Sequence, residues 1–208
     1  MFEFLTVEKA SETIITIKKS KFISNVKPVN TLEEAEEFIS AIRKKYYDAT
    51  HNVYAYSVGL GNEEMQKSSD DGEPSGTAGR PVLEVIRSKQ LKNVAVVVTR
   101  YFGGILLGAN GLIRAYSQSA KAGIENSGIA KVTKANEYKI KTDYSLFSKV
   151  ESQLRKNNFI IKQVEYDEAA KIHVFVPVKE VERFEKFILE AGINKGDVVF
   201  EKSCFIKI

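Results

Sequence analysis

The last third of the chain alternates between strand-like and helix-like hydrophobic patterns in an order that few folds accommodate. In chain order, the predicted elements are a strand over Lys134–Thr142, a helix capped by Asp143, a hairpin of Phe159–Tyr166 and Ala170–Pro177, a helix from Val181 to Gly192, and a strand over Val198–Ile208. This strand–helix–strand–strand–helix–strand order is complete within about 75 residues. It predicts a ferredoxin-like βαββαβ domain.

The residues before this segment give a different succession of elements. In chain order, these are a hairpin of Thr13–Lys18 and Lys21–Val29, a helix that starts at the capping box Thr31-Leu32-Glu33-Glu34, a strand over His51–Leu60, a helix over Pro81–Arg87, a strand over Val94–Tyr101 and a helix over Leu112–Asn126. We therefore expect an α+β protein with two domains, residues 1–130 and residues 131–208.

Composition excludes several classes of protein. Hydrophobic residues make up 43% of the 208 residues and charged residues 28%, which is typical of a globular chain and not of a disordered one. The net charge of +4 permits a nucleic-acid partner without requiring one. A single cysteine excludes an internal disulfide and a cysteine-type zinc site.

The hydropathy pattern argues against a membrane protein. The longest purely aliphatic run, Val94–Val98, is far shorter than the roughly 20 residues that a membrane-spanning helix needs. The N-terminal segment carries Glu3 and Glu8 and lacks the pattern of a signal peptide. We expect a cytoplasmic protein with no membrane partner, no cofactor and no bound metal.

Glycine is concentrated in the centre of the sequence. Seven of the 13 glycines fall between positions 72 and 111: Gly72, Gly76, Gly79, Gly103, Gly104, Gly108 and Gly111. They precede two predicted helices and stand near Arg80, Arg100 and Arg114. Exposed backbone N–H groups, helix N-termini and arginines together are typical of a site for phosphate. Neither a Walker motif nor GxGxxG is present, and tight turns explain single glycines equally well.

Three carboxylates form a second candidate site. Asp70, Asp71 and Glu73 could hold Mg²⁺ or act as acid and base, with His51 nearby in the predicted fold. They are just as natural as turn and helix-cap residues. The spacing does not match a calcium loop, so both interpretations stay open.

The other histidine and the cysteine point to structural roles. His173 alternates with Ile172 and Val174, so we expect it on the sheet face opposite the helices. Cys204 shares a strand face with Phe200 and Ile206, which predicts burial in the core and argues against a nucleophile.

Four longer motifs carry a resemblance to a known family. They are Lys19-Ser20-Lys21-Phe22-Ile23; Ala49-Thr50-His51-Asn52 with Tyr54-Ala55-Tyr56; Asp70-Asp71-Gly72-Glu73-Pro74-Ser75-Gly76-Thr77-Ala78-Gly79; and Val98-Thr99-Arg100-Tyr101-Phe102-Gly103-Gly104. Through them the whole chain resembles the IMPACT/YigZ family, with an IMPACT-type N-terminal domain and the small C-terminal domain of bacterial members. Val53 departs from the pattern, which often has cysteine there.

The resemblance implies both a fold and a field of function. It implies an N-terminal α+β sandwich similar to ribosomal proteins and to domain IV of elongation factor G. It also implies a role in translation, because eukaryotic relatives regulate initiation by competing for a ribosome-associated activator of an initiation-factor kinase. Bacterial relatives are connected with RNA or ribosomes.

We therefore expect a non-catalytic, translation-associated protein that binds RNA or the ribosome at the glycine-rich loops. The expected contacts are Lys21, His51, Arg80, Arg100, Tyr101, Gly103, Gly104 and Arg114. Two alternatives remain. One is a metal-assisted hydrolase of phosphate or peptide substrates that uses Asp70, Asp71 and Glu73. The other is a protein-interaction module of the translation machinery.

Overall fold

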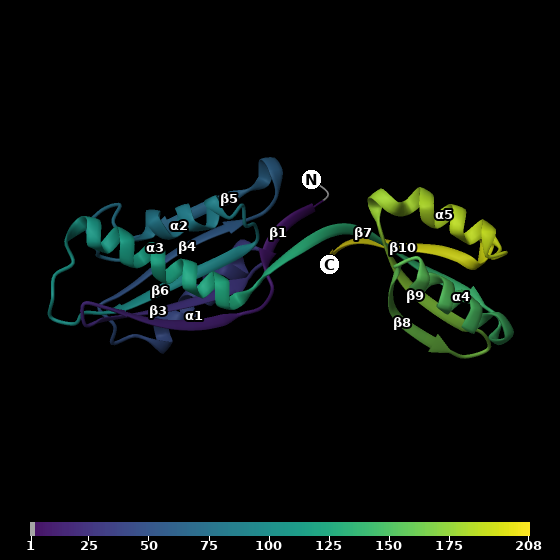
Figure 1. The fold of residues 1–208 in the computed structure, drawn as a ribbon, viewed down its shortest axis with the longest axis horizontal. Coiled ribbons are helices and arrows are strands. Elements are labelled where there is room, and N and C mark those ends of the chain that lie inside the picture. Colours follow the sequence, from purple (N-terminus) through teal and green to yellow (C-terminus); the bar gives the residue numbers. More distant parts are fainter. Residues whose placement is uncertain (1–2) are drawn as a thin grey trace. The chain divides into compact units, whose positions relative to one another are not determined.

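The computed structural model describes residues 3–208, which form two compact units, Glu3–Lys131 and Val132–Ile208 (Figure 1). In each unit helices pack on a β-sheet, so the predicted two-domain α+β fold is confirmed. Among residues 3–208, no helix combines the length and the hydropathy that crossing a bilayer requires.

Unit 1 is built on a five-stranded antiparallel sheet in the order β2-β3-β6-β4-β5. Its elements are β1 (Glu3–Val7), β2 (Ser11–Ile17), β3 (Ser20–Pro28), α1 (Leu32–Lys45), β4 (His51–Val58), β5 (Met65–Ser69), α2 (Gly79–Ser88), β6 (Val94–Tyr101) and α3 (Gly108–Ser127). β6 occupies the middle of the sheet, which explains its unbroken apolar sequence.

Helices cover both faces of this sheet. On one face, Ala35 and Ile39 of α1 pack with Val97 of β6. On the other face, Ile86 of α2 and Tyr116 of α3 belong to a separate core cluster. This second face carries the side chains that approach the glycine-rich loops.

Two strands of unit 1 and the start of α3 differ from the sequence-based expectation. β5 is a polar edge strand that pairs only with β4, and so it lacks the apolar alternation that marks a half-buried strand. β1 was also missed, although Val7 is fully buried. α3 begins at Gly108, one turn before the predicted Leu112, because four further residues, Gly108 to Gly111, are already helical.

Unit 2 has the predicted ferredoxin-like order. Its elements are β7 (Ile129–Thr142, which begins in unit 1), α4 (Tyr144–Lys156), β8 (Ile160–Tyr166), β9 (Ala170–Pro177), α5 (Val181–Glu190) and β10 (Val198–Lys207). The strands pair as β10-β7-β9-β8, all antiparallel. Ile140, Ile172 and Leu154 form the core between this sheet and the helices, together with Phe184 and Ile188.

Two edge segments of this sheet contain a β-bulge. In β10, Phe200 pairs with Tyr138 and Lys202 pairs with the next residue, Glu137, so Glu201 is the extra residue. In β8, Ile161 pairs with Val174 and Gln163 pairs with His173, so Lys162 is the extra residue. A bulge redirects the side chain of the inserted residue relative to the regular pleat.

A close approach of α3 to the sheet gives a test of the packing in unit 1. A Cβ on Gly123 would lie 2.8 Å from the Cβ of Ser24 and 3.0 Å from a methyl carbon of Val26. We expect Gly123→Val to lower the free energy of unfolding by at least about 2 kcal/mol, because the helix cannot move away without opening the core. Chemical denaturation would measure this loss. The control is Ala122→Val on the same turn, where the side chain is only half-buried; equal losses in the two variants would contradict the packing argument.

Candidate functional site

Arg100 stands at the end of β6 and is buried, with 5% of its surface exposed. Its Nη1 lies 2.6 Å from Oε1 of Glu73, and the hydroxyl of Tyr116 donates to the same oxygen at 2.7 Å. The guanidinium also lies between the rings of Phe22 and Phe102, at 5.6 Å from each centroid. The charge of Arg100 is therefore already paired inside the protein, which argues against the expected contact with phosphate.

The loop before α2 brings Glu73 to this position. Asp70 organises it by accepting three backbone N–H groups, from Gly76 at 2.9 Å, Ala78 at 3.0 Å and Gly79 at 2.8 Å. The N–H of Glu73 donates to the carbonyl oxygen of Asp70 at 3.0 Å. Asp70 thus acts as the cap of the loop and of the helix that follows it.

Asp71 has a third set of partners. Its carboxylate accepts from Arg43 at 2.5 Å and from the backbone N–H of Asn52 at 2.6 Å. Asp70, Asp71 and Glu73 therefore face different groups, and the described residues do not bring the three carboxylates together around one ion. Of the two interpretations of these carboxylates, the structure favours the one in which they hold the loop.

His51 begins β4 and lies beside the same ion pair. Its Nδ1 is 2.8 Å from the carbonyl oxygen of Asp71, and because a carbonyl only accepts, Nδ1 carries the hydrogen. Its Nε2 is 3.8 Å from Oε1 of Glu73. Burial, and then the carboxylate of Glu73, raise the pKa of Tyr116 far above its ordinary value. The loop thus holds the ring of His51 through Nδ1, beside the pair of Glu73 and Arg100.

A hollow of about 410 Å³ opens beside this network. His51, Glu73 and Arg100 form its polar wall, and Phe102 and Leu112 are part of its apolar wall. The lining of the hollow is mostly apolar, which differs from the polar anion pocket that the sequence predicted.

The loop between β6 and α3 packs against the turn between β2 and β3. A Cβ on Gly103 would overlap the backbone of Lys19, and the N–H of Gly103 donates to Oγ of Ser20 at 3.1 Å. Only glycine permits this contact. Lys21 is paired with Tyr101 in the sheet, so the two segments run side by side. The contact places the Lys18–Lys21 segment next to the glycine-rich loop.

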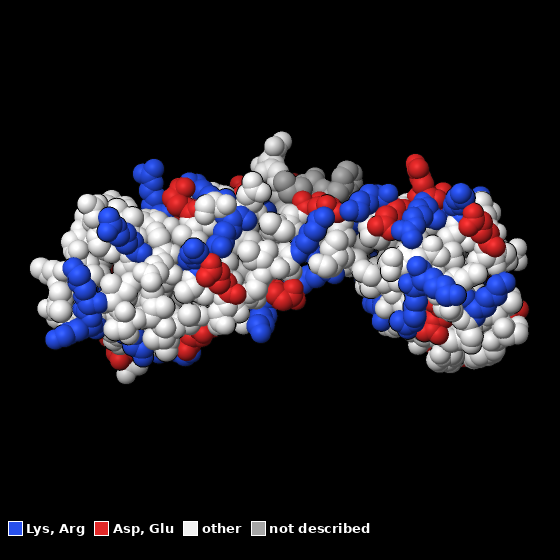
Figure 2. Space-filling model, in the orientation of Figure 1, with Lys and Arg blue, Asp and Glu red and all other residues white. Residues whose placement is uncertain are grey.

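This end of unit 1 is exposed, basic and partly apolar. Lys18, Lys19 and Lys21 are exposed. Phe102 is 47% exposed and Leu106 is 83% exposed. Figure 2 shows several Lys and Arg side chains projecting from the end of unit 1 where the β2–β3 turn and the β6–α3 loop lie in Figure 1. We call Lys18, Lys19, Lys21, Phe102, Leu106 and Arg114 the loop-end surface.

The remaining predicted contacts have different settings. Arg80, in the first turn of α2, and Arg114, in the second turn of α3, are exposed and form no ion pair with a described residue. The hydroxyl of Tyr101 donates to Asp48 at 2.7 Å. Gly104 has a φ of +81°, a conformation that favours glycine. These residues do not converge with Arg100 on one pocket.

Sequence reasoning missed the apolar part of the loop-end surface. Phe102 and Leu106 stand in the segment Phe-Gly-Gly-Ile-Leu-Leu, whose glycines suggest an anion site but whose apolar residues suggest a contact surface. Large apolar side chains in a loop with two glycines are exposed more often than those in a strand, and this signal could have identified them.

The comparisons with known proteins fit both units. Residues 18–124 match the Impact N-terminal domain, and residues 140–192 match a domain of unknown function, DUF1949. The IMPACT family member YvyE of Bacillus subtilis (strain 168) is 42% identical over 198 residues, which cover 95% of this chain and 91% of YvyE. The chain belongs to the IMPACT family.

Two further relatives support this membership. The IMPACT family member YigZ of Escherichia coli (strain K12) is 32% identical over 88% of this chain and 89% of its own. A solved structure described as a hypothetical protein superposes with a TM-score of 0.63 at 28% identity, over 96% of this chain and 97% of that one. The predicted membership of the IMPACT/YigZ family is confirmed for both units.

The buried ion pair gives a direct test of the site. We expect Glu73→Gln to lower the free energy of unfolding by about 3–5 kcal/mol, because it leaves the charge of Arg100 buried without a counter-charge. The control is Glu84→Gln, which breaks the exposed pair of Glu84 with Arg87 and should cost less than about 1 kcal/mol. Urea denaturation measures both; a Glu73→Gln variant as stable as Glu84→Gln would contradict the assignment.

The Tyr101–Asp48 hydrogen bond gives a test against pH. It raises the pKa of Tyr101 from 10.0 to about 12. The folded state thus holds this proton more tightly than the unfolded chain, so the stabilisation is full below about pH 10 and is lost as the pH rises towards 12. Phenolate absorbance, with Tyr101→Phe subtracted, should show the late transition in the wild type and an earlier one in Asp48→Asn. Identical midpoints would exclude the bond.

Proposed function

We propose that this protein is a non-catalytic component of translation and that it binds RNA, on the ribosome or free, through the loop-end surface. The proposed role in translation rests on membership of the family, whose motifs imply that role. The mode of binding is supported by one observation: the packing of Gly103 on Lys19 brings three exposed lysines beside the exposed Phe102.

The charges of this surface are available to a partner. Lys18, Lys19 and Arg114 form no ion pair with a residue in the described part of the chain, and neither does Lys21. Lys18 and Lys19 occupy the tight turn with φ angles of 44° and 65°, which fixes their backbone. A rigid group of cations binds phosphates at a lower entropic cost than the same cations on a flexible tail.

The apolar residues supply a second kind of contact. Phe102 offers a ring with 47% of its surface exposed, and bases stack on such rings without regard to sequence. Cations that contact phosphates next to an aromatic ring that contacts bases are typical of surfaces that bind single-stranded segments. The loop-end surface has both, whereas the buried Arg100 contributes only by holding the loop.

A non-catalytic role agrees with the use of the polar groups. Glu73, Asp71 and Asp70 are each committed to partners within the loop, and His51 is bound to the backbone of that loop. A general base or a nucleophile needs a lone pair that can reach substrate. Nε2 of His51 keeps a lone pair at the wall of the hollow, but the carboxylates that the hydrolase alternative would use with it are committed to other groups.

A salt series with a charge variant tests the proposal. The triple variant Lys18→Gln, Lys19→Gln and Lys21→Gln should bind a single-stranded RNA more weakly, and the slope of log K against log salt should become shallower by about 2, since each lost phosphate contact removes about 0.7. Filter binding with the intact chain measures both quantities. Co-sedimentation with ribosomes, before and after nuclease treatment, tests the same variant in a natural setting.

The matched control removes three lysines elsewhere in unit 1. Lys44, Lys67 and Lys121 are exposed and lie outside the loop-end surface, so their triple change to Gln alters the net charge equally. Equal losses in the two triple variants would contradict a defined surface. Ribosome association that persists after nuclease digestion would instead favour the protein-interaction alternative.

A further inference from the structure

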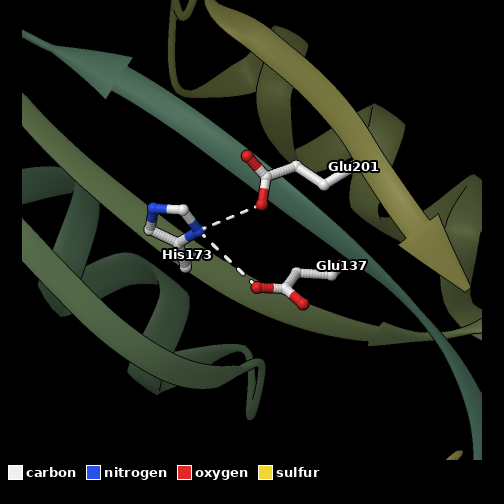
Figure 3. Close-up of side chains that lie close together, drawn as sticks. All are labelled: Glu137, His173 and Glu201. Carbon is white, nitrogen blue, oxygen red and sulfur yellow. Dashed lines mark ion pairs between the residues drawn. The ribbon is translucent and has the colours of Figure 1, made fainter. Parts of the chain in front are cut away.

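A histidine and two carboxylates meet on the sheet of unit 2, far along the sequence from the loops described above. They are Glu137 of β7, His173 of β9 and Glu201 of β10 (Figure 3). Ile172 and Val174, the neighbours of His173, pack in the core with the helices, so His173 lies on the opposite face of the sheet. This agrees with the sequence-based expectation for its direction. Its burial, with only 6% exposed, was not expected.

The backbone of unit 2 is shaped to bring these groups together. Glu137 and His173 belong to adjacent strands, in which Lys139 pairs with His173 and Phe175 pairs with Glu137. Glu201 is the extra residue of the β10 bulge, and this places its carboxylate over β7 and beside the ring (Figure 3). In a regular ladder, neighbouring side chains alternate between the two faces, so the bulge sets the direction of Glu201.

The distances suit a small cation. Nδ1 of His173 lies 3.3 Å from Oε2 of Glu201 and 3.6 Å from Oε1 of Glu137. Two ligand atoms that each lie about 2.0–2.2 Å from a tetrahedral zinc ion are about 3.3–3.6 Å apart. The three ligand atoms all lie within 4.8 Å of one another.

Several buried atoms of the cluster have no hydrogen bond. Both ring nitrogens of His173 and Oε2 of Glu137 are buried without a hydrogen-bond partner, and Glu137 is only 1% exposed. A buried polar atom without a partner costs about 1–3 kcal/mol, and native proteins contain few of them. Of these atoms, Nδ1 of His173 faces both Glu137 and Glu201, so a ligand held between the three side chains would give it a partner.

We propose that Glu137, His173 and Glu201 bind a divalent transition-metal ion, with Zn²⁺ as the best fit. One imidazole nitrogen and two carboxylate oxygens are ordinary ligands of Zn²⁺, and three protein ligands leave its fourth position open to water or to another ligand. On the other side of the ring, Nε2 of His173 lies 3.5 Å from Oε1 of Glu165. A carboxylate behind the ligating imidazole orients the ring and increases its basicity.

Lysines balance the carboxylates and compete with the cation. Lys162, the extra residue of the β8 bulge, lies 2.6 Å from Oε1 of Glu137, and Lys139 lies 3.0 Å from Oε1 of Glu201. Lys202 is 3.9 Å from Oε2 of Glu137. All three side chains are partly exposed, at 36%, 35% and 64%, so their ammonium groups can turn into solvent when the ion enters.

Metal titration of the intact, chelator-treated protein tests the proposal. Calorimetry with Zn²⁺ should show one site, and Co²⁺ should give the absorption of a low-symmetry complex. Glu201→Gln and His173→Gln should each weaken binding at least about tenfold, because loss of an outer partner alone costs 10–100-fold. Controls are Glu168→Gln, an exposed carboxylate of the same unit, and His51→Gln, which removes the other histidine.

The competition between Lys162 and the metal ion for Glu137 predicts a variant that binds Zn²⁺ more tightly than the wild type. Lys162→Gln should tighten Zn²⁺ binding several-fold and increase the shift in melting temperature on adding Zn²⁺, because Glu137 loses the nearer of its two lysines and the metal then supplies the missing positive charge. A purely structural ion-pair cluster would lose stability in this variant and regain none with the metal. That outcome, the absence of any Zn²⁺ site in the wild type, or binding lost in His51→Gln and kept in His173→Gln would each overturn the proposal.

Discussion

A single buried carboxylate, that of Glu73, holds the functional end of unit 1 in place. Through Oε1 it pairs with Arg100 of β6 and accepts from Tyr116 of α3, while its own loop leads into α2. Removing charge from water is expensive unless it is paired, so these elements must arrive in one arrangement for the pair to form. The position of the glycine-rich loop, and hence of Phe102, follows from that requirement.

The same pair explains why the proposed binding surface lies outside the hollow. Glu73 supplies, from within the chain, the negative oxygen that a phosphate would otherwise bring to Arg100. Arg100 therefore acts as a positioning residue, and the charges free to meet a partner are those of the β2–β3 turn and of α3. Different residues therefore serve the two purposes. The buried Arg100 and Glu73 hold the loop, and the exposed cations are left to contact a partner.

The sequence predicted the fold better than the site, for physical reasons. Periodicity reports which face of a strand or helix is apolar, and it predicted both units and the ferredoxin-like order. Periodicity does not show whether a charged side chain points to solvent or to a partner distant in sequence. Arg100 and Glu73 are separated by 27 residues, and neither shows in its own segment that the other neutralises it. The polar edge strand β5 was missed because it has no apolar face to detect.

The two bulges of unit 2 could not be predicted from the sequence, for a related reason. Each inserts one residue into a ladder, so alternation continued past the bulge assigns the later residues to the wrong face; Cys204, expected on the face of Phe200, lies on the face of Glu137. Deleting position 201 would restore an unbroken ladder and in the same step remove the carboxylate from the His173 cluster. Regularity of this sheet and possession of the cluster are therefore mutually exclusive. β10 therefore carries the bulge, although a strand without it would pair with β7 along its whole length.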